Sequence, residues 1–414
     1  MSYYLLPKTS VITYKYIDCF HTNEPAEPFI SNSLSSYLYE IKEKLDKREQ
    51  DWDIFKKYTN PYEYIHTVVP YKKKCIASYK PLSRSYFKMI ELVNTFNLHF
   101  DNKPIRTFHL AEGPGGFIEA ISKLRNNPND KYVGITILDD KNDTNIPAWK
   151  KSEHFLRQNK NVFIEKGEDG TGNILSLSNF VHCNQKYGGS MDFITADGGF
   201  DFSIDFNSQE INITRLLFAQ ICFAIALQKK GGSFVLKVFD CFMQNSIDIL
   251  YILSSFYDKV YISKPNTSRF ANSEKYIVCK HFLFSSSETY LPYLTRAFEK
   301  MMTGMVYSNE LTEKVPDLGF TYVSEINKSV LFIHRFLNFR IPYIFLTKLE
   351  EYNAILGQQQ IENIHYTISL IENKHKQDKI DNLIRVNIQK CIQWCTKFNV
   401  EHNTILNTPN MFLN

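Results

Sequence analysis

The sequence predicts an α/β fold in which a mostly parallel, seven-stranded sheet carries helices on both faces. Between about residues 105 and 285, short apolar segments typical of strands alternate with amphipathic segments typical of helices. The first strand-like segment ends in a glycine-rich turn that opens a helix, as at the ligand-binding edge of a parallel sheet. The last two strand-like segments, 260–263 and 276–284, have only a loop between them. We therefore expect the last strand to be antiparallel and to lie at the edge of the sheet.

Residues 1–79 are predicted to form a region that is irregular at first and helical later. Three prolines within residues 1–30 interrupt any helix there. Residues 71–74, Tyr-Lys-Lys-Lys, form a short basic run, which we interpret as a solvated loop, with contact to an RNA backbone as the second interpretation. An amphipathic helix with Lys and Glu on its outer face is indicated by four apolar residues at helical spacing: Leu34, Leu38, Ile41 and Leu45.

The central part of the chain alternates strands and helices. A helix at 85–96 precedes the first strand, and a helix at 117–125 follows the glycine-rich turn. A strongly apolar helix at 211–227 should be stopped by Gly231 and Gly232. The seven strands are expected at 107–110, 132–138, 162–164, 191–196, 233–239, 260–263 and 276–284.

From about residue 290 onward the sequence predicts helices only. Packing is the expected role of their apolar faces, because no glycine-rich turn and no recognisable chemistry occur there. The chain is accordingly divided into an N-terminal region (1–79), a central α/β domain (80–288) and a C-terminal helical region (289–414). The apolar stripes of the last region are Ile361, Ile364, Ile368 and Ile371, followed by Ile384, Ile388, Cys391 and Cys395.

The composition is that of an ordinary globular protein. With 414 residues, 43% hydrophobic and 22% charged, the chain suits two or three units, one of them large enough to bury its own core. The net charge of +4 permits contact with nucleic acid through a local patch but does not require it. Aromatic residues make up 14% of the chain, and any that are exposed can stack on bases.

The cysteines and the hydropathy pattern bear on compartment and metal binding. The eight cysteines are scattered without zinc-ligand spacing, so we expect neither a metal site nor a disulfide framework. The N-terminus has no basic-then-apolar signal segment, and we find no apolar run of about 18 residues, the length that a membrane span needs. We therefore expect an intracellular, reducing compartment and no membrane span.

The glycine-rich stretch at 109–117, His-Leu-Ala-Glu-Gly-Pro-Gly-Gly-Phe, is the first candidate for ligand binding. Glycines between a strand and a helix let the backbone approach a ligand and leave N–H groups at the helix start facing it. The stretch is neither a dinucleotide fingerprint nor a P-loop, so a phosphate cradle is not indicated. Taken alone, it is equally compatible with a purely structural turn.

Four polar residues stand out by position. Asp197 closes the fourth predicted strand, and Lys237 interrupts the apolar fifth strand, where an unpaired cation is costly. Glu274 lies just before the last strand, and Lys88 lies on the helix before the glycine-rich turn. Simpler readings exist: Lys88 can pair with Glu91 on its own helix, Asp197 can cap a turn, Glu274 can be a solvated loop charge, and Lys237 can reach solvent.

Four motifs in order resemble the FtsJ-like RNA ribose 2′-O-methyltransferases, and most of all the mRNA cap methyltransferases of eukaryotes and large DNA viruses. They are Glu-Gly-Pro-Gly-Gly-Phe, Thr-Ala-Asp-Gly-Gly, Gly-Gly-Ser-Phe-Val-Leu-Lys-Val-Phe and Ser-Arg-Phe-Ala-Asn-Ser-Glu-Lys-Tyr, and the likeness covers roughly residues 80–285. It implies a Rossmann-like methyltransferase domain at 80–288, with helical additions at both ends. It also implies a catalytic Lys-Asp-Lys-Glu tetrad, at Lys88, Asp197, Lys237 and Glu274.

The resemblance further implies S-adenosylmethionine as methyl donor and no metal. His109 stands where many members of the family carry an acid, so Glu112 is expected to take that role. The residue that holds the donor's ribose is left open between Thr136 and Asp139. The residues implied in donor binding are Ser83, Glu112, Gly113, Pro114, Gly115, Gly116, Phe117, Asp169 and Asp197.

The expected function is methyl transfer to a ribose 2′-hydroxyl of RNA, with the first transcribed nucleotides of capped mRNA as the preferred target. Lys237 would either remove the hydroxyl proton or orient the hydroxyl and stabilise the alkoxide. The alternatives are ribosomal or transfer RNA as substrate, or an inactive RNA-binding or scaffold subunit that kept the fold. RNA is the expected partner, no protein partner is identified, and a viral factory joins the cytoplasm and the nucleus as a candidate compartment.

Overall fold

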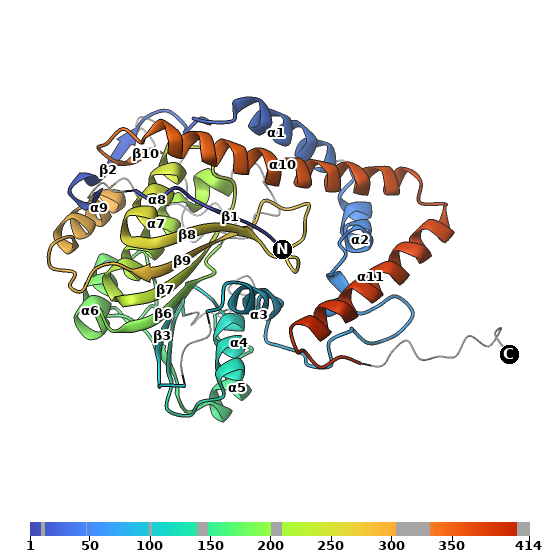
Figure 1. The fold of residues 1–414 in the computed structure, drawn as a ribbon, viewed down its shortest axis with the longest axis horizontal. Helices are drawn as coiled ribbons and strands as arrows, with labels where there is room; N and C mark the ends of the chain where they lie inside the picture. The colour runs from blue at the N-terminus through green and yellow to red at the C-terminus, as the bar shows by residue number, and fades with distance from the viewer. Residues whose placement is uncertain are drawn as a thin grey trace, which may run out of the picture.

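The computed structural model describes residues 1–9, 13–46, 48–98, 102–138, 148–199, 209–303 and 332–403. A large sheet with helices on both faces forms the body of the molecule, and two long C-terminal helices extend from it (Figure 1). The strands are β1 (Ser2–Leu5), β2 (Ile17–Thr22), β3 (Arg106–Leu110), β4 (Lys131–Ile135), β5 (Val162–Glu165), β6 (Met191–Ala196), β7 (Gln228–Val238), β8 (Tyr257–Lys264), β9 (Lys275–Phe282) and β10 (Phe332–Leu337).

The helices of the described residues surround this sheet. They are α1 (Asn32–Asp46), α2 (Glu49–Thr59), α3 (Ser85–Thr95), α4 (Gly116–Arg125), α5 (Glu153–Gln158), α6 (Leu177–Tyr187), α7 (Gln209–Leu227), α8 (Gln244–Phe256), α9 (Leu291–Thr303), α10 (Tyr343–Glu372) and α11 (Gln377–Lys397). Two short 3₁₀ helices, η1 (Thr13–Tyr16) and η2 (Glu63–Ile65), lie in the N-terminal region.

The order of the large sheet is β1-β8-β9-β7-β6-β3-β4-β5. Strands β3 to β7 pair in parallel, and β9 pairs antiparallel with both β7 and β8. The mostly parallel sheet and the antiparallel last strand are therefore confirmed. The expectation that this strand forms the edge is wrong, because β9 lies between β7 and β8. Its apolar sequence suits a strand that is buried on both faces.

Two N-terminal strands were not predicted, and because one of them, β1, joins the large sheet, that sheet has eight strands rather than seven. Strand β1 pairs antiparallel with β8 and forms an edge of the sheet, while β2 pairs with β10 in a separate ribbon. The prediction of an entirely helical C-terminal region is therefore wrong at β10. These strands have four to six residues and partners far away in the chain, so local periodicity carries little signal for them.

The end of the apolar helix also differs from the prediction. Helix α7 ends at Leu227, and β7 begins at Gln228 and passes through Gly231 and Gly232. Gly231 has a φ of +81°, and the pairing with β6 shifts register in this part of the strand. The glycines thus accommodate an irregularity at the start of a strand instead of stopping a helix.

Alternate residues of the central strands point into two hydrophobic cores, one on each face of the sheet. In β7, Phe234 and Leu236 belong to the core that α6, α7, α8 and α9 cover. Val235 belongs to the opposite core, which α3, α4 and α11 cover. Among the described helices, α7 alone is long and apolar enough to cross a membrane by length and composition. However, 83% of its apolar 18-residue stretch is buried inside the protein. Here α7 packs as a core helix.

The helical additions at the two ends of the chain pack against each other. Helix α10 contacts α1 and α2, and α11 contacts α2 and η2. Figure 1 shows α10 running alongside α1 over one end of the sheet. A Cβ on Gly357 of α10 would lie 2.9 Å from the side chain of Leu34 in α1, so the two helices approach closely there. The basic run at 71–74 is a solvent-exposed turn, which both of its interpretations require.

Candidate active site

The structure brings Lys88 and Glu274 together in a buried ion pair. Lys88 lies on α3, and Glu274 ends the loop that precedes β9. The Nζ atom of Lys88 lies 2.8 Å from Oε2 and 2.7 Å from Oε1 of Glu274, and the two residues are 3% and 7% exposed. The simpler readings, a Lys88–Glu91 pair and a solvated Glu274, are both wrong.

Asp197 and Lys237 form a second pair at the carboxyl ends of two parallel neighbours, β6 and β7. The Nζ atom of Lys237 donates a hydrogen bond to the backbone oxygen of Asp197 at 2.6 Å and lies 3.4 Å from its Oδ1 atom. Both side chains are mostly buried, at 13% and 15% exposure. The lysine in the apolar strand is therefore paired rather than solvated. Pairing offsets the free-energy cost of burying its charge.

Tyr276 connects the two pairs, and the sequence analysis missed it. It lies opposite Lys237 in the β7–β9 ladder, and its hydroxyl donates to Oδ1 of Asp197 at 3.1 Å. The Nζ atom of Lys88 lies 5.8 Å from the centre of its ring, and the ring of Phe117 packs against it, with 6.0 Å between ring centres. The cross-strand position opposite Lys237 is the signal that points to Tyr276, but it requires knowledge of the register.

Nearby cations hold the Glu274 carboxyl in its ionised form. Burial alone raises the pKa of Glu274, but the nearby cations, led by Lys88 and Lys237, outweigh it and hold that pKa well below its usual range. Burial lowers the pKa of Lys88, and the carboxylate of Glu274 opposes that shift. Glu274 is therefore an anion at neutral pH and compensates the charge that α3 places beside it.

The loop at 265–274 carries Glu274 and is fixed from within the sheet by Lys264. The buried Nζ atom of Lys264 donates to the backbone and side-chain oxygens of Asn272 at 2.7 and 2.6 Å. It also donates to the backbone oxygen of Glu274 at 2.7 Å. Lys264 thus determines where the backbone of Glu274 lies without occupying its carboxylate.

Glu91, one turn after Lys88 on α3, fixes the beginning of the same loop. Its carboxylate accepts hydrogen bonds from the backbone N–H groups of Asn266 and Thr267 at 2.9 and 3.1 Å. It also accepts one from the indole of Trp394 on α11 at 3.3 Å. The acid that was considered as a partner for Lys88 therefore links the loop to the C-terminal helices.

The terminal additions hold the remainder of the loop. Arg269 forms a bidentate ion pair with Glu63 of η2, whose carboxylate also accepts a hydrogen bond from Asn60 at 2.8 Å. From the other end of the chain, Gln360 of α10 donates to the backbone oxygen of Ala271 at 3.2 Å. Segments on both sides of the central domain thus position the loop that carries Glu274.

A cleft of about 420 Å³ opens beside Lys237 and Glu274. Residues from α1, α2, β7, the loop at 265–274 and α10 line it, so the additions at both ends of the chain form part of its wall. Its lining combines cations and aromatic rings: Lys42, Lys56, Arg84, Arg269, Trp52 and Phe239. Such a surface suits a polyanion whose bases can stack.

The glycine-rich turn lies between β3 and α4, as predicted. A Cβ on Gly113 would lie 2.4 Å from the backbone oxygen of Ala148, and Gly115 has a φ of +98°, so both positions require glycine. A Cβ on Gly116 would lie 2.2 Å from Oγ of Ser83. Ser83 and the turn, which were both expected to bind the donor, are therefore adjacent.

Glu112 presents an unpaired carboxylate oxygen at this turn. The side chain is 4% exposed, and its Oε1 accepts a hydrogen bond from Thr195 and lies 3.4 Å from Nδ1 of His109. Its Oε2 has no hydrogen-bond partner among the described residues. Burial raises the pKa of this carboxyl. A buried acceptor without a partner fits the ammonium group of an amino-acid ligand.

Asp169 holds its own loop together. Its Oδ1 accepts hydrogen bonds from the backbone N–H of Thr171 and from the side-chain amide of Asn179, both at 2.9 Å, and the residue is exposed. The loop reaches the end of β4, because a Cβ on Gly172 would lie 2.1 Å from the backbone oxygen of Thr136. Asp139, the other candidate for the ribose contact, lies outside the described residues.

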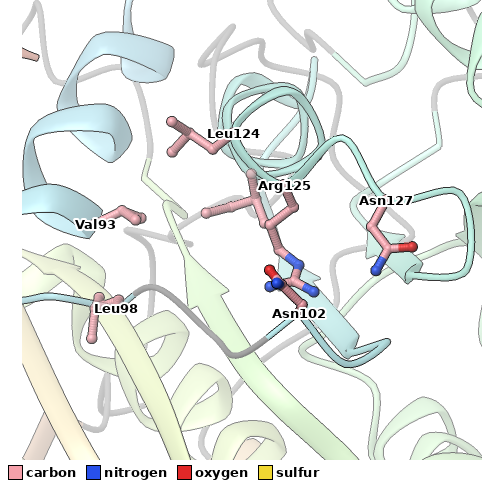
Figure 2. Close-up of a pocket in the computed structure, with 7 residues that line it drawn as sticks. Val93, Leu98, Asn102, Leu124, Arg125 and Asn127 are labelled. Atoms are coloured by element: carbon pink, nitrogen blue, oxygen red, sulfur yellow. The ribbon is translucent and has the colours of Figure 1, made fainter. Parts of the chain in front are cut away.

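A second cavity, of about 260 Å³, lies at the C-terminal ends of α3 and α4 (Figure 2). Val93, Leu124 and Arg125 are among its lining residues, and Arg125 forms an ion pair with Asp130. It contains none of the predicted site residues. Among the described residues, no group of three or more His, Cys, Asp or Glu side chains has an arrangement that could hold a metal ion.

Residues 81–282 match the model of the FtsJ-like methyltransferase family. A cap-specific mRNA (nucleoside-2′-O-)-methyltransferase 2 of Pongo abelii is 28% identical over 397 residues, or 93% of this chain and 47% of the relative. A cap-specific mRNA (nucleoside-2′-O-)-methyltransferase 1 of Homo sapiens is 34% identical over 246 residues, or 53% of this chain and 27% of the relative. The chain thus spans less than half the length of both relatives. The solved structure of human methyltransferase-like protein 13 in complex with SAH covers 53% of this chain and 90% of its own, at 10% identity and a TM-score of 0.31.

Proposed function

Because residues 81–282 form an FtsJ-like methyltransferase domain, we propose that this protein methylates a ribose 2′-hydroxyl in the first transcribed nucleotides of capped mRNA, with S-adenosylmethionine as donor. The observation that carries the proposal is the convergence of two lysine–carboxylate pairs, Lys88–Glu274 and Lys237–Asp197, at one end of the sheet. This arrangement suits a ribose hydroxyl as substrate, because the hydroxyl oxygen develops negative charge as it reacts and a lysine can stabilise that charge.

The donor would bind at the glycine-rich turn. Glu112 would accept its ammonium group through the oxygen that has no partner, and the bare backbone of Gly113 and Gly115 would lie against it. When bound, the donor supplies an electrophilic methyl group. Asp197 follows β6, which is the parallel neighbour of β3, so donor and acceptor sites would share one edge of the sheet. Ser83, Pro114, Gly116, Phe117 and Asp169 remain proposed donor contacts.

Lys237 would contact the reacting oxygen. As the oxygen forms its bond to the methyl carbon, the bond from that carbon to the donor sulfur breaks and the hydroxyl proton leaves. The Nζ atom of Lys237 is held by Asp197 at the mouth of the cleft, where it either accepts this proton or donates a hydrogen bond to the developing alkoxide.

Capped mRNA is favoured over internal ribose in ribosomal or transfer RNA. The similarity to the Pongo abelii cap methyltransferase extends over 93% of this chain and therefore includes much of the helical additions. Those additions form part of the cleft wall, so the similarity extends to segments that line the proposed substrate cleft as well as to the central domain. An enzyme with this substrate would act in the cytoplasm, the nucleus or a viral factory.

The test is methyl transfer from labelled donor to four RNAs of one sequence: capped, uncapped, capped with 2′-deoxyribose at the first two nucleotides, and an unrelated structured RNA. We expect transfer only to the capped RNA that keeps its 2′-hydroxyls. Mass spectrometry of nuclease digests should place the methyl group on ribose. A mark on a base, or equal transfer to the deoxy substrate, would overturn the ribose assignment.

A second comparison separates an enzyme from a scaffold. Lys237→Ala should lower the rate about 10²- to 10⁴-fold while S-adenosylhomocysteine binding and the Tm stay nearly unchanged, because the lost group acts mainly in the transition state. Wild-type protein that binds RNA tightly but methylates none of the four RNAs would support the scaffold alternative.

A further inference from the structure

Resting on the proposed function, we propose that Arg84 binds the RNA phosphate next to the reacting ribose and so orients the 2′-hydroxyl toward Lys237. The sequence analysis did not single out Arg84, and the tetrad does not include it. Its placement, the state of its neighbours and the chemistry of the substrate each support this role.

The first observation is the position of Arg84 beside the ion pair and the cleft. Arg84 occupies the N-cap position of α3 with helical backbone angles, so it lies one turn before Lys88 on the same side of the helix. Arg84 lines the cleft together with Lys237 and Glu274. Its charge contributes to the lowered pKa values of both Lys88 and Glu274. Arg84 is therefore close to the buried ion pair and also accessible from the cleft.

The second observation is that the other cleft cations are already compensated. Each of them forms an ion pair with a carboxylate: Lys42 with Asp240, Lys56 with Asp53, Lys237 with Asp197 and Arg269 with Glu63. Among the described residues, the side chain of Arg84 forms neither a hydrogen bond nor an ion pair. It is thus the cleft cation, of those described, whose hydrogen-bonding groups remain available to a ligand.

The third consideration is the substrate. In RNA the 2′-oxygen and the 3′-phosphate sit on neighbouring carbons of one ribose, so a hydroxyl beside Lys237 brings a phosphate close to it. A planar guanidinium binds phosphate oxygens with two parallel hydrogen bonds, which fixes orientation as well as adding affinity. An arginine beside the tetrad would hold the 3′-phosphate and thereby orient the 2′-hydroxyl toward Lys237.

The experiment measures RNA binding, so it does not depend on activity. Fluorescence anisotropy with a labelled capped RNA across a range of salt concentrations compares wild type, Arg84→Ala, Arg84→Lys and a control, Arg157→Ala. Arg157 is an arginine of α5, 73% exposed, whose partner Glu153 lies on the same helix. Arg84→Ala should raise Kd about 10-fold or more and reduce the slope of log Kd against log salt by about 0.7, the value for one phosphate on a single strand.

A modified RNA locates the contact. Replacing the phosphate 3′ to the target nucleotide by a neutral methylphosphonate should weaken binding to wild type and to Arg157→Ala, but have little further effect on Arg84→Ala. Arg84→Lys should keep the salt slope, because the positive charge remains. It should lose part of the affinity, because lysine lacks the planar group that donates two parallel hydrogen bonds. Circular dichroism and Tm check that each variant is folded.

Two results would overturn the assignment. In the first, the methylphosphonate weakens wild type and Arg84→Ala equally. In the second, Arg84→Ala binds RNA normally but loses S-adenosylhomocysteine in calorimetry, which places the arginine in the donor site. Failure of the proposed function has a different signature, since wild type would then bind RNA without methylating it.

Discussion

Glu63 and Arg269 form a bidentate ion pair across 206 positions of the chain, with 2.9 Å from Nε to Oε2 and 2.6 Å from Nη2 to Oε1. Glu63 is fully buried. The pair joins the N-terminal region to the loop that ends at Glu274. A residue outside the matched family segment, 81–282, thereby helps to position a member of the tetrad.

Glu63→Gln should destabilise the protein by about 3 kcal/mol at pH 7, because Arg269 loses its buried counter-charge. Burial alone raises the pKa of Glu63, but Arg269 outweighs it and holds that pKa well below its usual range. The stabilisation is therefore fully present above the unfolded pKa of about 4.3 and is lost as the pH falls below it. Urea unfolding at several pH values should show the gap between wild type and variant narrowing under acid conditions.

The matched control is Glu153→Gln, which removes the exposed partner of Arg157 and should change the free energy of unfolding by less than about 0.5 kcal/mol. Glu63→Gln should also lower kcat while the affinity for S-adenosylhomocysteine is retained, since among the described residues this pair forms no hydrogen bond or ion pair with the glycine-rich turn. A stability gap that stays constant down to pH 3 would contradict the assigned charge state.

Tyr276→Phe should reduce methyl transfer by about 10- to 100-fold, the value of one hydrogen bond to a carboxylate. The variant keeps the ring that packs against Phe117 and lies beside Lys88, and it loses only the hydroxyl that donates to Asp197. Single-turnover kinetics with saturating donor and RNA measure the effect. If Tyr276→Phe matches wild type, then Asp197 is positioned by Lys237 and the backbone alone.

Gly113→Ala should abolish binding of S-adenosylhomocysteine, as measured by calorimetry. The added Cβ would lie 2.4 Å from the backbone oxygen of Ala148, so the turn must move. Gly189→Ala, before β6, is the control: its Cβ meets nothing within 4 Å, although its φ of +60° makes the substitution strained. That strain should cost about 1–2 kcal/mol of stability and leave donor affinity unchanged. Equal loss of affinity in both variants would separate the turn from the donor site.

Glu112→Gln should weaken binding of S-adenosylhomocysteine about 10-fold or more, because a charge-assisted hydrogen bond to the ligand's ammonium group is lost. Because burial raises the pKa of Glu112, its carboxyl takes up a proton at a higher pH than an ordinary glutamate does. Affinity in wild type should therefore fall as the pH is lowered from neutral, and affinity in Glu112→Gln should depend less on pH. Parallel pH dependence in the two proteins would remove Glu112 from the donor site.

The parts of the site that sequence reasoning identified are local in the chain. The glycine-rich turn is encoded by adjacent residues, and Asp197 and Lys237 stand at the ends of strands that the apolar pattern reveals. Parallel pairing then brings strand ends together at one edge. Lys88 and Glu274 were singled out by position, but only the family resemblance implied a shared role for them, because a lysine on a helix and a glutamate in a loop have nothing unusual in their local sequence.

The parts that were missed depend on distant contacts. Strand β1 finds its partner β8 about 260 residues away in the chain, and Glu63 finds Arg269 across a similar distance. Tyr276 needs the register of β9, and the insertion of β9 between β7 and β8 follows from packing that no local pattern records. The roles of Glu91 and Lys264 likewise depend on the course of the loop at 265–274.

The arrangement of this loop limits how far the protein can be dissected. A fragment cut at the borders of the family match would keep the whole tetrad. It would lack Glu63, which holds Arg269, and Gln360, which holds Ala271. It would also lose β1 and so leave the edge of β8 unpaired, which invites association with other chains. The segment that matches the family model therefore depends on both ends of the chain for the position of this loop and for the pairing of β8.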